Sequence, residues 1–213
     1  MLDLHTHTLI SDGVLTPAEL IRRAEVKGYR GLVISDHVDN GTLAYVVGML
    51  VRGCGEIQKA CRMKIVPGVE ITHCRPGQIA DLVAEARRLG AGVVLVHGET
   101  IVEPVLPGTN RAAIEAGADV LAHPGLLSEE DAYLAREKDV HLEVSGRKGH
   151  SLTNGHVTAL ARKVEAKLVF GSDAHEPGDI FTRAQAEEVL LGAGLVPLEV
   201  AEVFRNMERL LGL

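Results

Sequence analysis

The sequence predicts an α/β fold in which parallel strands alternate with helices. Three observations predict it. Short runs rich in Val, Ile and Leu recur along the chain, segments with helical spacing separate them, and polar side chains follow the runs. Runs without apolar–polar alternation are typical of a parallel sheet buried on both faces. Seven such units in 213 residues suit a parallel barrel or an open doubly wound sheet. No linker rich in Pro, Gly and Ser divides residues 1–213, so we expect a single domain.

The predicted strands and helices follow in strict alternation. The strands are expected at 2–5, 31–35, 65–70, 93–97, 119–123, 141–145 and 168–171. The first helix is expected to begin at Thr16, a good N-cap, with Pro17 in its first turn. Further helices are expected at 78–89, 110–116, from 128 onward, and at 154–164, 182–191 and 197–211. The stretch 41–62 is the least clear, because Gly48, Gly53 and Gly55 weaken a single long helix.

Composition excludes several classes of function. The 22 Lys and Arg against 29 Asp and Glu give a net charge of −7, which argues against duplex nucleic acid as a partner. Aromatic residues make up only 3%, so stacking platforms for single strands are not expected. No apolar run is long enough for a membrane helix, and the N-terminus does not resemble a signal peptide. Three Cys without a CxxC pair suggest reduced thiols, so we expect a cytoplasmic protein. A monomer or small homo-oligomer is expected, although the sequence does not choose between them.

Residues capable of chemistry gather where the predicted strands end. These segments are His5-Thr6-His7 with Asp12 after it, Ser35-Asp36-His37, Gly68-Val69-Glu70, His97-Gly98-Glu99, His123-Pro124-Gly125, Ser145-Gly146-Arg147 and Ser172-Asp173-Ala174-His175. In a parallel barrel all strands end at one rim, so these side chains would converge. In an open sheet they would spread along a line. The pattern therefore favours a closed barrel.

Imidazole and carboxylate groups in this number predict a metal centre. His5 and His7 lie two residues apart on a strand, so both point to the same side and can share an ion. Such donors suit Zn, Mn or Fe. The candidate ligands are His5, His7, Asp12, His37, Glu70, His97, His123, Asp173 and His175. At three or four ligands per ion, they fit two to three divalent ions. Closely spaced ions suit the hydrolysis of a phosphoester by a metal-activated hydroxide, and their charge would attract an anion despite the acidic chain.

The HxH segment, Ser35-Asp36-His37, Gly68-Val69-Glu70 and Ser172-Asp173-Ala174-His175 together resemble the PHP (polymerase and histidinol phosphatase) superfamily. This resemblance implies a distorted (β/α)7 TIM-like barrel with a trinuclear metal centre. It assigns His5, His7, Glu70 and Asp173 to one ion, Asp12, His37 and His175 to a second, and Glu70, His97 and His123 to a third. Asp12 stands where some members carry His. The short chain is most similar to histidinol-phosphatase-type phosphoesterases.

Other residues near the expected rim are candidates for catalysis and substrate binding. Asp173, His175 and Arg147 are expected to act in catalysis. Phosphate contacts are expected from Arg147, Lys148, His150 and Arg183, because Arg binds phosphate with two donors and Lys as a point charge. Asp36 and Glu99 are possible supporting acids. For His73 a loop role is favoured, and for His141 and His156 a structural one.

The function that fits best is hydrolysis of a small phosphate monoester, with histidinol phosphate as a candidate through the family resemblance alone. One alternative is a phosphodiesterase or nuclease acting on small nucleotides. An amidohydrolase-like hydrolase is disfavoured, because the bridging candidate Glu70 lies on the third strand and not the fourth. A non-catalytic binding or regulatory barrel is disfavoured because no expected ligand is missing.

Overall fold

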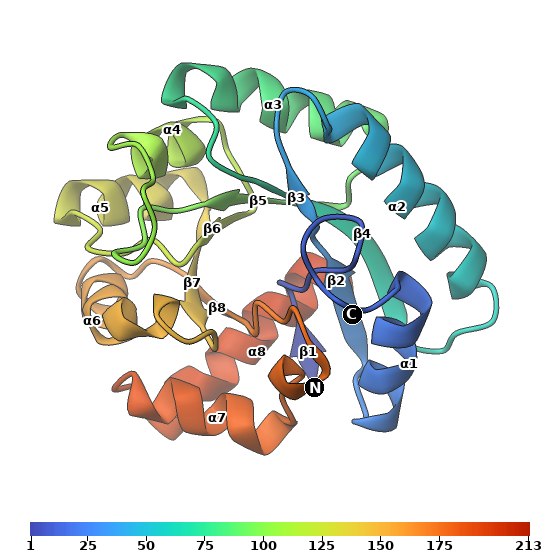
Figure 1. The fold of residues 1–213 in the computed structure, drawn as a ribbon. Helices are drawn as coiled ribbons and strands as arrows, with labels where there is room; N and C mark the ends of the chain where they lie inside the picture. Colours follow the sequence, from blue (N-terminus) through green and yellow to red (C-terminus); the bar gives the residue numbers. More distant parts are fainter.

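The chain folds into a parallel sheet that curves into a nearly closed barrel with helices around it (Figure 1). The computed structural model describes all residues 1–213. Its strands are β1 (Leu2–Asp3), β2 (Gly31–Ile34), β3 (His37–Val38), β4 (Lys64–Ile71), β5 (Val93–His97), β6 (Val120–Ala122), β7 (His141–Ser145) and β8 (Leu168–Gly171). They are ordered β1-β2-β4-β5-β6-β7-β8, with β3 paired to β4. The distorted (β/α)7 barrel predicted from the sequence is thus confirmed.

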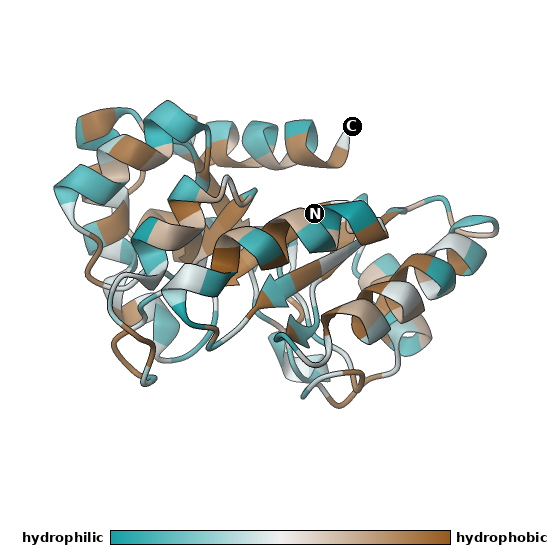
Figure 2. Cartoon of the chain, turned by 90° about the horizontal axis from the view of Figure 1, so that it is seen from above, coloured by the Kyte–Doolittle hydropathy of each residue, from teal (hydrophilic) through white to brown (hydrophobic).

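Helices connect the strands and cover the outside of the barrel. They are α1 (Pro17–Val26), α2 (Leu43–Gln58), α3 (Pro76–Leu89), α4 (Thr109–Glu115), α5 (Glu129–Lys138), η1 (His150–Thr153), α6 (Asn154–Val164), η2 (Pro177–Asp179), α7 (Arg183–Gly192) and α8 (Pro197–Leu211). Figure 2 shows hydrophilic and hydrophobic stretches alternating along these helices, as expected when one face packs on a sheet. None of the helices is both long and apolar enough to cross a membrane.

The barrel closes at a short seam between the segments that directly follow β1 and β8. Thr6 and Ala174 form an isolated parallel bridge, and the His7 N–H donates to the Ala174 carbonyl at 2.8 Å. The Asp173 N–H donates to the His5 carbonyl at 2.9 Å. These bonds join the two ends of the sequence directly, so an open sheet is excluded. They also set the HxH segment beside the Asp173 segment.

The strands are buried on both faces, which explains their lack of alternation. All four residues of β2 and of β8, and all five of β5, are buried. They belong to one continuous core of 59 buried apolar residues. Apolar packing therefore holds the strands rigidly and fixes the positions of the polar side chains at their ends.

The stretch 41–62 contains one long helix, α2, despite its glycines. A Cβ on Gly48, Gly53 or Gly55 would meet no atom within 4 Å, so these glycines face open space. The opposite side of α2 is buried, for example at Val47 and Leu50. Each glycine costs roughly 1 kcal/mol of helix propensity. The burial of an apolar stripe outweighs that cost, and the expectation of a weakened helix was wrong.

Candidate metal centre

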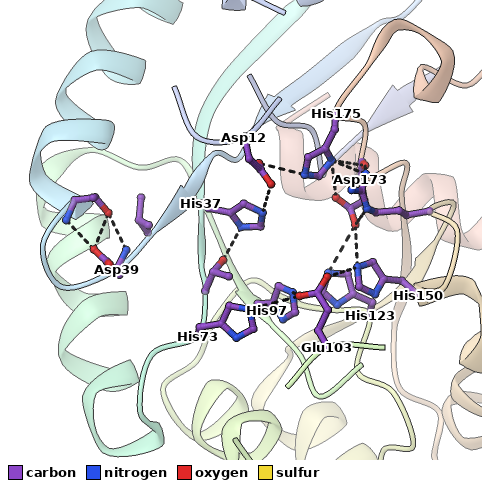
Figure 3. A pocket seen from close by; sticks show the side chains of 14 residues that line it. Asp12, His37, Asp39, His73, His97, Glu103, His123, His150, Asp173 and His175 are labelled. Carbon is purple, nitrogen blue, oxygen red and sulfur yellow. Dashed lines mark hydrogen bonds and ion pairs between the residues drawn. The ribbon is translucent and has the colours of Figure 1, made fainter. Parts of the chain in front are cut away.

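The carboxyl ends of the strands surround a polar cleft of about 450 Å³. Of the 14 residues that line it, only Val38 is hydrophobic. Figure 3 shows their side chains arranged around a common centre, with Asp12, Asp173 and His175 on one side and His73, His97, His123 and His150 on the other. Many donors with few apolar neighbours suit a cluster of cations and a charged substrate.

The deepest donors come from the segment after β1, from β4 and from the segment after β8. His5 Nε2 lies 3.3 Å from Glu70 Oε2, and His7 Nε2 lies 3.3 Å from Asp173 Oδ1. His7 Nε2 also lies 3.7 Å from Glu70 Oε2, and His5 Nε2 lies 3.8 Å from Asp173 Oδ1. Ligands at 2.0–2.1 Å from a tetrahedral zinc are about 3.3 Å apart, so the spacing fits one ion.

Several of these buried atoms have no hydrogen-bond partner. They are His5 Nε2, both ring nitrogens of His7, both carboxylate oxygens of Glu70 and His123 Nδ1. Buried polar atoms are almost always paired in native proteins. Unpaired imidazole and carboxylate atoms buried around one space fit bound divalent cations. These donors therefore fit the divalent ions that the sequence predicts.

A second group of donors lies next to the first and is more exposed. His175 Nε2 is 3.2 Å from Asp12 Oδ1, and His37 Nε2 is 3.6 Å from Asp12 Oδ2. His7 Nδ1 also approaches Asp12, at 4.0 Å. The two nitrogens of His7 thus face the two groups. The three residues assigned to a second ion by resemblance are together in the structure.

The third set is only partly assembled. His123 Nε2 lies 3.3 Å from Glu70 Oε1. His97 has no contact with Glu70 within 4.0 Å and instead places its Nε2 3.1 Å from Glu103 Oε2. His150 stacks on His123 with ring centroids 4.0 Å apart. All nine predicted ligands thus gather at one rim, while their division among ions stays a prediction.

The predicted substrate contacts divide between the cleft and other surfaces. Arg147 lines the cleft, and its Nη1 approaches His175 Nδ1 at 2.7 Å and donates to the Asp173 carbonyl at 3.1 Å. His150 also lines it and is buried. Lys148 lines an adjoining cleft that shares Arg147 and His175.

Arg183 is the exception among these candidates. It does not line either cleft, since its Nε donates to Glu187 at 2.6 Å and its guanidinium lies 3.3 Å from the centroid of the Phe204 ring. It begins helix α7, and packing against α8 turns it away from the metal centre. The structure thus places Arg183 outside both clefts, and its phosphate contact stays a prediction.

Two acidic residues at the centre were missed by the sequence analysis. Glu143, buried on β7, places Oε1 2.7 Å from His5 Nδ1, and its Oε2 accepts the backbone N–H of His123 at 2.9 Å. The signal for it was a carboxylate inside an apolar strand. Glu103 lies in the loop after β5, where no local pattern distinguishes it.

The supporting acids and remaining histidines have structural partners. Asp36 accepts the N–H and the hydroxyl of Thr8 and so braces the loop that carries Asp12. Glu99 accepts backbone N–H groups at the start of α4, from Gly108 and Asn110. Ring nitrogens of His141 and His156 lie within hydrogen-bond distance of backbone carbonyls, those of Asp119 and Leu127 respectively.

Burial and mutual charge set the protonation of the donors. Burial lowers the pKa of His7 to about 3, so this ring is neutral at pH 7. Burial also acts to lower the pKa of His5, but Glu143, Glu70 and Asp173 together raise it well above its usual value. Burial acts in the same way on His37, where the charges of Glu70 and Asp12 prevail and raise the pKa to about 10.

The carboxylates respond in the opposite sense. Burial acts to raise the pKa of Glu70 and of Asp173, but the surrounding imidazoles outweigh it and hold both well below their usual values. Both are therefore ionised at pH 7. A cation that binds here replaces protons on His5 and His37, so metal binding is expected to release protons.

Two known proteins are similar to this chain in sequence over most of its length. No family model matches the sequence. The uncharacterized protein MJ1295 of Methanocaldococcus jannaschii is 41% identical over 200 residues, covering 93% of this chain and 92% of that protein. Ribonuclease P protein component 3 of Methanococcoides burtonii is 27% identical over 231 residues, covering 96% and 88%.

Solved structures share the barrel at low sequence identity. The histidinol phosphate phosphatase of Lactococcus lactis, complexed with zinc, L-histidinol and phosphate, has a TM-score of 0.63 at 15% identity, covering 92% of this chain and 94% of that one. A two-domain Bacteroides vulgatus protein containing a predicted PHP-like metal-dependent phosphoesterase gives 0.52 at 19% identity, covering 83% and 52%. A. niger ochratoxinase gives 0.65 at 14%, covering 99% and 70%.

The barrel, with its rim of buried imidazoles and carboxylates, has the same fold as the histidinol phosphate phosphatase and the PHP-like metal-dependent phosphoesterase domain, the fold that the sequence motifs indicated. Within that class, the chain belongs to the family of the uncharacterized protein MJ1295.

Proposed function

We propose that this protein is a metal-dependent phosphatase that hydrolyses a small phosphate monoester. The observation that carries the proposal is the set of orphaned, buried donors on His5, His7 and Glu70 at the floor of an open polar cleft. A second support is Arg147, a cation on the wall of the same cleft. Cations and a guanidinium around one space suit a phosphate dianion.

Different residues would bind the ions and the phosphate. His5, His7, Glu70 and Asp173 would hold one ion, with Asp12, His37 and His175 at a second. Bound divalent ions supply Lewis-acid stabilisation and an activated water. The hydrogen bond from Arg147 to the Asp173 carbonyl positions its guanidinium, whose remaining N–H groups are free to bind a phosphate oxygen. Positioned donors of this kind stabilise the charge that develops during phosphoryl transfer.

The lining of the cleft limits the substrate. Val38 is the only hydrophobic lining residue, and no Phe, Tyr or Trp is present. A polar alcohol is therefore favoured as the leaving group over a large apolar or stacked one. Histidinol phosphate is a specific candidate, because the similar Lactococcus lactis structure is complexed with zinc, L-histidinol and phosphate.

A panel of phosphoesters tests the proposal. The purified protein would be assayed with p-nitrophenyl phosphate, histidinol phosphate, sugar phosphates, bis(p-nitrophenyl) phosphate and a single-stranded oligonucleotide, with Zn²⁺, Mn²⁺ or Fe²⁺. We expect monoester turnover that a chelator abolishes and His5→Ala removes. His156→Ala, a histidine change outside the cleft, should retain it. Full activity of the His5→Ala variant would refute the assignment.

The same panel separates a second candidate, a phosphodiesterase or nuclease. The name of the Methanococcoides burtonii relative favours it. The net charge of −7 argues against it, because nucleic-acid backbones bind to clustered cations. Turnover of the diester or the oligonucleotide at a higher kcat/KM than any monoester would favour this second function.

A further inference from the structure

A buried histidine that the ion assignments do not use lies on the wall of the cleft. His150 begins η1, shortly after Arg147, and is 4% exposed. Its ring stacks on the ring of His123, with centroids 4.0 Å apart and planes inclined by 16° (Figure 3). Its Nδ1 lies 2.7 Å from Oγ1 of Thr100, in the loop after β5. The stacking and this hydrogen bond together hold the ring in one orientation.

The hydroxyl of Thr100 fixes which nitrogen of His150 carries the proton. Thr100 is buried, and its Oγ1 has no other hydrogen-bond partner, so Nδ1 of His150 is the only acceptor for its O–H. A proton on Nδ1 would leave this buried hydroxyl without an acceptor, and buried polar groups are almost always paired. The Thr100 hydroxyl therefore donates to Nδ1, and the proton of the neutral ring is on Nε2.

His37, an expected metal ligand, shows the opposite arrangement. Its Nδ1 lies 2.6 Å from Oγ1 of Thr72, but that hydroxyl donates to the Glu70 carbonyl at 3.0 Å. Thr72 therefore accepts from Nδ1 of His37, which leaves the Nε2 lone pair free for an ion beside Asp12. The same two residue types thus prepare His37 to bind a cation and His150 to donate a hydrogen bond.

The Nε2–H of His150 faces the cleft without a hydrogen-bond acceptor. The nearest oxygens are Glu103 Oε1 at 3.5 Å and Asp173 Oδ2 at 3.7 Å, both beyond the usual range of an N–H···O bond. Arg147 Nε lies 3.7 Å from the same oxygen of Asp173. One charged and one neutral donor therefore approach the same part of the cleft, where the oxygens of one phosphate group can accept from both.

We propose that Thr100 is a positioning residue that holds His150 as a neutral donor, whose Nε2–H binds an oxygen of the substrate phosphate beside Arg147. The inference rests on the proposed function, because it requires a phosphate group in the cleft. Arg147 supplies positive charge there, and His150 adds a directed hydrogen bond without adding charge. A donor that is fixed before the substrate arrives loses little freedom when the substrate binds.

Binding of inorganic phosphate to the zinc-loaded protein tests the proposal without turnover. The affinity is measured by titration calorimetry, and bound zinc is counted by mass spectrometry. Thr100→Val removes the hydroxyl and keeps the shape of the side chain, whereas His150→Leu removes the donor. Thr100→Ser and His150→Gln are the conservative variants, since they retain a hydroxyl and an N–H donor. Thr158→Val is the control, because the Thr158 hydroxyl donates to the Ala193 carbonyl and does not line the cleft.

We expect His150→Leu to weaken phosphate binding about tenfold or more, and Thr100→Val about threefold to tenfold. Thr100→Ser and the control should bind phosphate like the wild type, and His150→Gln should bind it more tightly than His150→Leu. The zinc content should be the same in all proteins. In the wild type, the ¹⁵N resonances of the His150 ring, identified by their absence from the His150→Gln spectrum, should show the proton on Nε2.

Three results would overturn the proposal: zinc in place of the proton on Nε2 of His150, wild-type phosphate affinity in a folded His150→Leu or Thr100→Val protein, or zinc-loaded wild type that binds no phosphate. The phosphoester panel decides the proposed function separately. A protein that binds phosphate in the expected pattern but hydrolyses no monoester would lose the phosphatase assignment and keep this donor. An active phosphatase whose kcat/KM is unchanged by His150→Leu would lose only the donor.

Discussion

Replacing Glu143 with Gln should weaken metal binding without changing the shape of the site. Glu143 Oε1 lies 2.7 Å from His5 Nδ1, and both side chains are buried. When His5 Nε2 faces an ion, Nδ1 carries the proton and donates it to this carboxylate, which fixes the ring and increases its basicity. Gln keeps the volume of the side chain but loses its charge, and an NH₂ donor replaces one of the two carboxylate oxygens.

The size of the effect follows from those contacts. A buried hydrogen bond to a charged group contributes about 1.5–3 kcal/mol. Gln also sets a donor against either His5 Nδ1 or the His123 N–H, which now donates to Glu143 Oε2 at 2.9 Å. At 1.4 kcal/mol for each factor of ten, the affinity for the ion at His5 should fall about 10–100-fold.

Competition between the protein and a chromophoric chelator for Zn²⁺ measures this affinity, and phosphoester turnover at saturating zinc reports the site once filled. Asp119→Asn is the matched control, since Asp119 accepts the Val94 N–H at the other end of the barrel. That variant should lose stability and keep zinc affinity. Wild-type zinc affinity in a folded Glu143→Gln protein would refute the role given to this carboxylate.

Three further predictions address the packing, the cations and pH. A Cβ on Gly171 would lie 1.9 Å from Glu143 Oε1, so Gly171→Ala should cost about 1–3 kcal/mol or more in urea unfolding and also reduce zinc binding; unchanged values would contradict the packing. Zinc at about 100 times its Kd should raise Tm by roughly 5–10 °C over chelated protein, whereas an unchanged Tm would mean no binding to the folded state. Burial lowers the pKa of His141, so the folded state keeps it neutral while the unfolded chain takes up a proton near pH 6.5. The stability that this residue contributes is therefore present above pH 6.5 and lost as the pH falls. With a chelator present, the free energy of unfolding of the His141→Gln variant should fall less between pH 7.5 and 5.5 than that of the wild type, and an equal fall in both proteins would contradict this.

Much of the fold could be predicted because its signals are local and repeated. The predicted strands match β1, β2 and β4 to β8 to within a few residues. The two-residue β3 was missed, because nothing within His37–Val38 marks a strand and only its pairing with Glu70 and Ile71 creates one. The long helix α2 was underestimated because burial of its far side, which no local propensity reports, outweighs its glycines.

The site followed from the rule that parallel strands end at one rim, which brought His5, Glu70 and Asp173 together correctly. Residues that depend on loop paths or on packing escaped it. Glu103 reaches the cleft through the course of the loop after β5, and Arg183 lies outside it, with its guanidinium against Phe204 and its Nε bonded to Glu187. Neither fact is encoded in the spacing of nearby residues.

The seam between β1 and β8 ties the assembly of the centre to the order in which the chain folds. Contacts between the two ends of a sequence carry the largest loop-closure entropy and tend to form late. Only a few backbone hydrogen bonds join the seam, yet donors from both of its sides face the same point. A cation bound there would link the segment after the first strand to the segment after the last. Asp173 is synthesised long after His5, His7 and Glu70, so a metal site that needs all four residues can be completed only once the last strand has joined the barrel.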